Sequence, residues 1–189
     1  DFDSIPEEVA KKAKAIIVSY PANPICRLAP VSFYKELIAW ANKYKVIVLH
    51  DNAYSELVYD GKRGISFLSV EGAKEIGIEF NSLSKTYNLT GARISFAVGN
   101  KEIISQFKKL RSQIDYGIFL PVQKAAVAAL NGPQDSVERN RAEYERRRNT
   151  LRDGLDSIGW KGLVSEGTMF AWAPLPKGYT NSNDFVLDF

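Results

Sequence analysis

The sequence predicts an α/β protein in which helices flank a mostly parallel sheet. Four short apolar runs have the length of strands: residues 15–20, 46–50, 75–80 and 94–98. Segments with apolar residues at helical spacing lie between or after them, at 30–44, 100–114 and 122–130. Strands that alternate with helices through short connections indicate parallel pairing. Hydrophobic residues make up 45% of the 189 positions, which is ordinary for a globular protein.

The first elements follow from local patterns. The strand 15–20 leads into Pro21-Ala22-Asn23-Pro24, an extended or turn segment, because a residue before proline avoids the helical region. A helix is expected to begin at Pro30, with one face formed by Tyr34, Leu37, Ile38, Ala41 and Tyr44. The strand 46–50 is a continuous apolar run, as expected for a strand that is buried on both faces.

The next elements surround Lys85, which lies in a predicted turn between the strands 75–80 and 94–98. Asn100 has the position of an N-cap before a helix with apolar residues at Ile103, Ile104, Phe107, Leu110 and Ile114. The loop 115–121 is rich in aromatic and apolar residues, which indicates a local core. The helix 122–130 is expected to end at Asn131-Gly132-Pro133, a strong stop signal.

The arginine-rich stretch 138–152 has two interpretations, a nucleic-acid-binding patch or a solvated helix. Glutamates interleave its six arginines, and the net charge of the whole chain is only +3. An apolar face at helical spacing supports the helix: Val137, Tyr144, Leu151, Leu155 and Ile158. We therefore predict a long amphipathic helix that ends before Gly159, and no nucleic-acid partner. Residues 169–172 are predicted to begin a strand of a smaller domain.

The composition excludes several kinds of site. Cys26 is the only cysteine and His50 the only histidine, so an internal disulfide and a histidine-rich metal site are excluded. A single cysteine fits a reducing compartment, and we predict a cytoplasmic protein. No run approaches the ~20 apolar residues of a membrane span, so no membrane association is predicted. A nucleophilic pair of Cys26 and His50 is conceivable, but no third residue that would orient it is evident.

Lys85 is the strongest candidate for a catalytic residue. Burial between two strands favours the neutral form of an amine, and a neutral lysine can form a Schiff base. Two nearby serines, Ser82 and Ser84, and the following Arg93 could hold a phosphate. A lysine beside a phosphate site suggests pyridoxal 5'-phosphate as cofactor. The alternatives are a solvated surface lysine, or the Ser-x-x-Lys signature of serine β-lactamases, whose companion motifs are absent.

Polar residues at the ends of two other strands support the same site. Asp51 directly follows the strand 46–50, and ligands of open α/β sheets bind beyond the carboxyl ends of strands. A carboxylate there could pair with the pyridinium nitrogen of the cofactor, while Tyr54 and Asn23 could bond its ring oxygen. The alternatives are a helix cap for Asp51 and an ordinary turn asparagine for Asn23.

These segments together resemble the aspartate aminotransferase fold family, the fold-type I enzymes that use pyridoxal phosphate. The similar motifs are, in order, Tyr20-Pro21-Ala22-Asn23-Pro24, Asp51-x-x-Tyr54, Ser82-x-Ser84-Lys85 and Gly91-x-Arg93. The chain departs from the family pattern at Ile25-Cys26, Ala92 and Ser95, where relatives often carry Thr-Gly, tryptophan and glycine. The first departure weakens the assignment of Asn23.

The resemblance implies a role for each site residue. Lys85 would form the imine with the cofactor and move the substrate proton. Asp51 would bind the ring nitrogen, and Asn23 and Tyr54 would bind the ring oxygen. The phosphate would be held by Ser82, Ser84 and Arg93.

The resemblance also implies an incomplete chain, because family members are about twice as long. Residues 1–135 would be the second half of the large cofactor-binding domain, and residues 136–189 the linker helix and the start of a small α+β domain. The missing parts would include a glycine-containing phosphate loop, an aromatic residue that stacks on the ring, and an arginine for the substrate carboxylate. We therefore expect this polypeptide alone to be catalytically incomplete. In the family, the loop that corresponds to residues 115–121 approaches the active site of the partner subunit, so the resemblance implies a homodimer contact there.

The implied function is an aminotransferase that exchanges an amino group between an amino acid and a 2-oxo acid. The lysine motif resembles most the subgroup with LL-diaminopimelate and aspartate aminotransferases. Two alternatives remain open at this stage. The same fold supports carbon–sulfur β-lyases, because the pocket selects which bond breaks. A related domain also serves as a sensor in transcription regulators.

Overall fold

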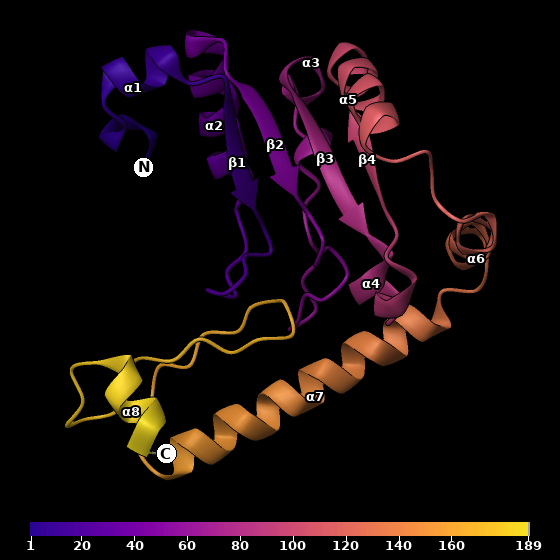
Figure 1. Cartoon of the computed structure of the whole chain (residues 1–189). Helices are drawn as coiled ribbons and strands as arrows, with labels where there is room; N and C mark the ends of the chain where they lie inside the picture. Colours follow the sequence, from indigo (N-terminus) through magenta and orange to yellow (C-terminus); the bar gives the residue numbers. More distant parts are fainter. Residues whose placement is uncertain (189) are drawn as a thin grey trace.

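A computed structural model describes residues 1–188 and contains one four-stranded sheet. Its strands are β1 (Ala15–Ser19), β2 (Ile47–Asp51), β3 (Gly77–Ser82) and β4 (Ser95–Gly99), in the order β1-β2-β3-β4. The pairs β1–β2 and β2–β3 are parallel, and β3–β4 is antiparallel. The predicted α/β class with a mostly parallel sheet is therefore confirmed (Figure 1).

Eight α-helices and three short 3-10 helices connect or extend this sheet within the described residues. The α-helices are α1 (Glu7–Lys12), α2 (Val31–Tyr44), α3 (Ala73–Ile76), α4 (Leu83–Thr86), α5 (Lys101–Ile114), α6 (Leu120–Asn131), α7 (Asp135–Ser157) and α8 (Ser182–Asp188). The 3-10 helices are η1 (Phe2–Ser4), η2 (Phe67–Ser69) and η3 (Thr90–Ala92). None of the helices in this part of the chain is both long and apolar enough to cross a membrane.

The predicted long helices are present. Asn100 caps α5 as expected, because its side chain accepts hydrogen bonds from the backbone N–H groups of Glu102 and Ile103. Helix α7 is long and solvated as predicted, and Glu143 pairs with Arg146 and Arg147 on its surface. Its predicted apolar face is covered only in part, because Val137 is buried whereas Leu151 and Ile158 are exposed. The short helices α1 and α8 are absent from the prediction, because one or two turns carry little periodic signal.

Each face of the sheet is covered over only part of its width. Helix α2 packs on one face of β1 and β2, where Val48 and Tyr34 are fully buried. Side chains of the opposite face are exposed at β1 and β2, with Ile17 75% and Ile47 37% accessible. The expectation that strand 46–50 is buried on both faces is therefore wrong for the described residues. On that opposite face, α5 covers β3, where the rings of Phe80 and Phe107 lie 5.7 Å apart.

Strand β3 begins two residues later than the sequence pattern predicts. Residues 73–76 form the helical turn α3, and Gly77 then starts the strand with an extended backbone. A side chain at Gly77 would collide with its neighbours, because a Cβ atom there would lie 2.7 Å from Phe67 Cε1 and 2.8 Å from the carbonyl oxygen of Val48. Close approach of β2, η2 and β3 thus requires glycine at this position.

The segment after α7 docks on the sheet domain without forming the predicted strand 169–172. The backbone N–H of Glu166 donates to the carbonyl of Cys26 at 2.9 Å, and that of Thr168 donates to Leu57 at 2.8 Å. In the described part of this segment, strand pairing is limited to the isolated bridges Val58–Gly167 and Val164–Trp172. Thr168, directly before the predicted strand, has a left-handed backbone with φ 71°.

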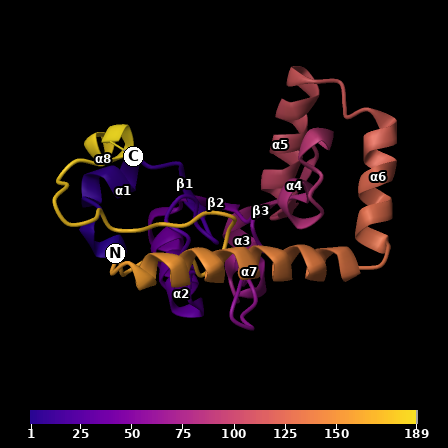
Figure 2. The ribbon, with the colours of Figure 1, turned by 90° about the horizontal axis from the view of Figure 1, so that it is seen from below.

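Helix α7 carries this segment along the edge of the sheet domain. In both views, α6 lies at one end of α7 and α8 at the other (Figures 1 and 2). The guanidinium of Arg148 on α7 forms two hydrogen bonds with the Asp60 carboxylate, at 3.1 and 2.6 Å, and a third with the carbonyl of Ser165 at 2.9 Å. Arg148 therefore connects α7, the loop after β2 and the docked segment.

Two glycine substitutions should have opposite effects on stability. Gly77→Ala is expected to lower the free energy of unfolding by about 2 kcal/mol, because the new methyl group overpacks the β2–β3 contact. Gly154→Ala is the matched control, since a Cβ atom at this exposed helical position meets no atom within 4 Å. It should raise stability by about 1 kcal/mol through helix propensity. Denaturant titrations of the complete protein measure both, and equal effects of the two variants would contradict the packing described for Gly77.

Candidate active site

The predicted site residues lie at the edge of the sheet where the parallel strands end. The register pairs Ser19 with Asp51 and Asp51 with Phe80, so β1 and β2 end level, while β3 continues two residues further to Ser82. Neighbouring strands are spaced by about 4.8 Å, so this edge spans roughly 10 Å from β1 to β3. Helix α4 and the loops after β1 and β2 extend from this edge (Figure 1).

Asp51, Tyr54 and Asn23 are brought together, although they follow different strands. Burial raises the pKa of Tyr54, the charge of Asp51 raises it further, and a hydrogen bond with the Asn23 side chain opposes both. Asp51 is exposed, and its Oδ1 accepts a hydrogen bond from the N–H of Ala53 at 3.1 Å. It thus caps a turn rather than a helix, and its other carboxylate oxygen forms no hydrogen bond within residues 1–188.

Lys85 lies on the short helix α4 and not in the turn that the sequence predicts. Ser82 caps this helix by accepting a hydrogen bond from the N–H of Ser84 at 3.2 Å. The carbonyl of Lys85 accepts a hydrogen bond from Asn140 on α7 at 3.2 Å, which fixes the backbone of the lysine. The side chain is half-buried, and its Nζ forms no hydrogen bond or ion pair with any residue in the described chain. Its amine is therefore available for chemistry.

The strand that follows Lys85 differs from the prediction in its environment. The sequence suggests two core strands around the lysine, but β4 is an edge strand with mostly exposed residues. Its other edge has no partner strand among residues 1–188. The lysine therefore does not lie between two core strands as predicted.

The three predicted phosphate ligands differ in accessibility. Arg93 is exposed, has a left-handed backbone (φ 51°), and donates one hydrogen bond to the carbonyl of Thr90 at 3.2 Å. It has no acidic partner in the described part of the chain, so its remaining donors can meet an anion. Ser82 is half-buried, whereas Ser84 is only 7% exposed. Ser82 and Arg93 are therefore better placed than Ser84 to reach a phosphate.

Sequence reasoning missed a buried polar cluster beneath this edge. Glu79 on β3 accepts a hydrogen bond from Nδ1 of His50 at 3.1 Å, and Nε2 of His50 lies 3.0 Å from the hydroxyl of Tyr34. A glutamate between Ile78 and Phe80 in an apolar strand is the signal that could have indicated it. The conceivable Cys26–His50 pair is wrong, because both histidine nitrogens have other partners and the Cys26 thiol contacts Pro24 and Thr168.

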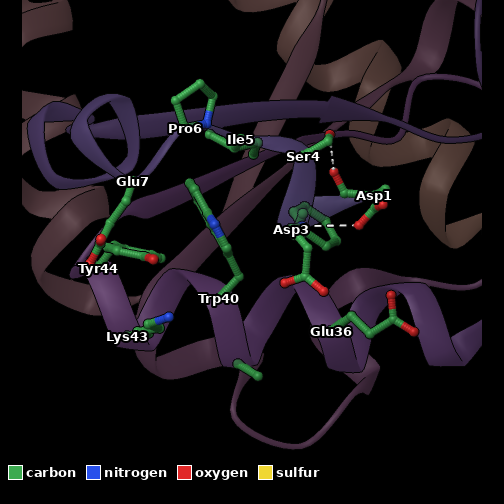
Figure 3. Close-up of a pocket in the computed structure, with 12 residues that line it drawn as sticks. Asp1, Asp3, Ser4, Ile5, Pro6, Glu7, Glu36, Trp40, Lys43 and Tyr44 are labelled. Carbon is green, nitrogen blue, oxygen red and sulfur yellow. Dashed lines mark hydrogen bonds between the residues drawn. The ribbon is translucent and has the colours of Figure 1, made fainter.

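A large hollow lies elsewhere in the molecule and does not include these residues. It has a volume of about 700 Å³ and is formed by residues 1–7 and one side of α2, including Trp40 (Figure 3). Ser4 and Asp3 bond to Asp1 within it. The candidate site is instead an open edge that presents polar groups.

Comparison with known proteins identifies the family. The family model of aminotransferase class I and II matches residues 1–185. This chain belongs to that family. The chain is 45% identical over 185 residues to an LL-diaminopimelate aminotransferase of Halothermothrix orenii, a match that covers 98% of this chain and 47% of the relative. It is 46% identical to an LL-diaminopimelate aminotransferase of Aquifex aeolicus, with 98% and 48% covered.

Solved structures of family members have the same fold. The substrate-bound BacF structure from Bacillus subtilis matches with a TM-score of 0.91 and 35% identity, over 98% of this chain and 47% of that chain. A probable N-succinyldiaminopimelate aminotransferase from Thermus thermophilus matches with a TM-score of 0.88 and 33% identity, over 95% and 48%. The chain thus spans about half the length of the aminotransferases that it matches, and the predicted fold-type I architecture is confirmed.

The environment of Tyr54 gives a test that needs no cofactor. Asp51→Asn is expected to lower the pKa of Tyr54, because it removes a negative charge that disfavours the phenolate. Asn23→Ala should raise this pKa, because the opposing hydrogen bond is lost. Nuclear magnetic resonance of ring-labelled tyrosine during a pH titration measures both, with Tyr54→Phe to assign the signal. Asp60→Asn is the control, since Asp60 pairs with Arg148, and an equal shift in this variant would contradict the proximity of Asp51 and Tyr54.

Proposed function

We propose that this chain is the lysine-bearing half of a pyridoxal-phosphate-dependent aminotransferase, which exchanges an amino group between an amino acid and a 2-oxo acid. The observation that carries the proposal is the grouping of Asp51, Tyr54 and Asn23 at the same strand edge as the unpaired amine of Lys85. Family membership supports the same activity.

The residues at this edge fit the chemical groups of pyridoxal phosphate. The cofactor has a basic ring nitrogen, a phenolic oxygen, an aldehyde and a phosphate. Asp51 offers a carboxylate with a free oxygen for the protonated nitrogen. Tyr54 and Asn23 offer a hydroxyl and an amide for the phenolic oxygen, and Arg93 offers unpaired guanidinium donors for the phosphate. The edge, roughly 10 Å across, is wide enough for a pyridine ring and its substituents.

Each side chain at the site would have a separate role in the reaction. Bound pyridoxal phosphate supplies an electron sink for the charge that remains when a bond to the substrate α-carbon breaks. Lys85 would hold the cofactor through its amine and, once released, would move the α-proton as a general base and acid. Asp51 would keep a proton on the ring nitrogen by charge pairing. Tyr54 and Asn23 would orient the ring, and Ser82 and Arg93, with Ser84 as a weaker candidate, would anchor the phosphate.

Several properties of the complete protein form part of this proposal. Residues 1–135 would belong to the large domain and residues 136–189 to the linker helix and small domain. LL-diaminopimelate is the first substrate to test, because the relatives at about 45% identity carry its name. A cytoplasmic homodimer is proposed, with the loop after α5 as a subunit contact, since Ile114, Tyr116 and Phe119 are all strongly exposed there.

Replacement of Lys85 tests the proposal. The complete protein with pyridoxal phosphate should show a visible absorbance band of a protein imine, which borohydride removes by reduction. Lys85→Ala should show no such band, and its rate of transamination should fall at least ~10⁴-fold, because both the covalent link and the proton carrier are removed. Lys101→Ala, at an exposed lysine of α5, is the matched control and should behave as wild type. A band that persists unchanged in Lys85→Ala would refute the proposed role.

A further inference from the structure

Glu79 is a buried carboxylate with an unusually full set of hydrogen-bond donors. It lies in the middle of β3 and is only 3% exposed. Five donors reach its two oxygens: His50 Nδ1 at 3.1 Å, Asn52 Nδ2 at 3.0 Å, Asn81 Nδ2 at 3.1 Å, Ser66 Oγ at 2.9 Å and the backbone N–H of Phe67 at 2.9 Å. A buried carboxylate needs such compensation, because loss of hydration otherwise disfavours its charge.

The donors show what this carboxylate holds in place. His50 and Asn52 are the two sequence neighbours of Asp51. Asn81 directly precedes Ser82, which caps the helix that carries Lys85. Glu79 thus bonds to the residues on both sides of the ring-nitrogen carboxylate and to the residue before the lysine helix. The remaining two donors, Ser66 and Phe67, belong to a segment that carries none of the candidate site residues.

The charge state of the cluster is consistent with its geometry. Burial alone would raise the pKa of Glu79, but its hydrogen bonds, with that of His50 as the largest, lower it to about 2. Burial also raises the pKa of the Tyr34 hydroxyl, which therefore keeps its proton. Tyr34 can then donate to Nε2 of His50, and the Nδ1–H group can donate to Glu79.

Glu79 does not itself belong to the surface that would meet the cofactor. In the β2–β3 register, Asp51 lies opposite Phe80, and His50 lies opposite Glu79. Because side chains alternate along a strand, Glu79 and His50 point to the face opposite Asp51. Any effect of Glu79 on Asp51 must therefore pass through the backbone and through the neighbouring residues 50 and 52.

We propose that Glu79 is a positioning residue for the cofactor site, which it serves by fixing the ends of β2 and β3 so that Asp51 and the Ser82–Lys85 segment stand at the correct separation. This inference rests on the proposed function, because its readout is cofactor binding. Glu79 would thus support cofactor binding without contacting the cofactor.

A pair of single-donor variants separates positioning from general stability. Asn52→Ala and Ser66→Ala each remove one hydrogen bond from the same carboxylate, but only Asn52 adjoins a site residue. Asn52 is also 3% exposed, so it cannot contact the cofactor directly. In the complete protein, both variants should lower the midpoint temperature of thermal unfolding by a few degrees. Asn52→Ala should weaken pyridoxal phosphate binding roughly tenfold, whereas Ser66→Ala should leave the dissociation constant within about twofold of wild type.

Glu79→Gln extends the test, because one acceptor oxygen becomes a donor that faces other donors. We expect it to weaken pyridoxal phosphate binding more than Asn52→Ala, as measured by absorbance titration, with exposed Glu75→Gln as the control. Equal dissociation constants for Asn52→Ala and Ser66→Ala, beside a wild-type protein that binds the cofactor, would overturn the positioning role alone. This pair decides the question even where Glu79→Gln does not fold. Absence of binding in the wild-type protein would instead overturn the proposed function.

Discussion

The parallel pairing of β1, β2 and β3 is the constraint on which the candidate site depends. Parallel strands place all their carboxyl ends at one edge, and the register puts Asp51 beside Ser19 at the end of β1 and beside Phe80 near the end of β3. The bonds of Glu79 then tie β2 to β3 at that edge. Three segments that are far apart in the sequence thereby present a carboxylate, hydroxyl and amide groups, and an amine at one edge of the sheet.

The segment after α7 reaches the same edge from outside the sheet. Its backbone bonds to Cys26 and Leu57, and Arg148 bonds to Asp60 in the loop after β2. The ring of Phe170 lies 6.0 Å from that of Tyr54, in an edge-to-face arrangement. Residues of the proposed small domain therefore contact the turn that carries Tyr54, the candidate ring ligand. A movement of α7 would change this contact.

Much of this arrangement could be predicted because it rests on local patterns. Strand ends marked by Asp51 and by Asn23-Pro24, and the cap at Asn100, were readable from single segments. The Glu79 cluster was not, because a charged residue in an apolar strand reveals neither its depth nor its partners. The prediction that β2 is buried on both faces was wrong for a related reason. The apolar run of this strand predicts burial on both faces, but Ile47 is exposed because no described helix packs there. The predicted strand at 169–172 is also wrong, because its apolar residues do not show that within residues 1–188 only Trp172 pairs, in an isolated bridge with Val164.

In the proposed enzyme, the amine of Lys85 on α4 is the covalent anchor of the cofactor. The most direct measurement is peptide mapping by mass spectrometry of the complete protein, after loading with pyridoxal phosphate and reduction with borohydride. We predict one pyridoxyl group per chain, on the peptide that contains Lys85. Modification of a different lysine, or labelling spread over several exposed lysines with none preferred, would contradict it.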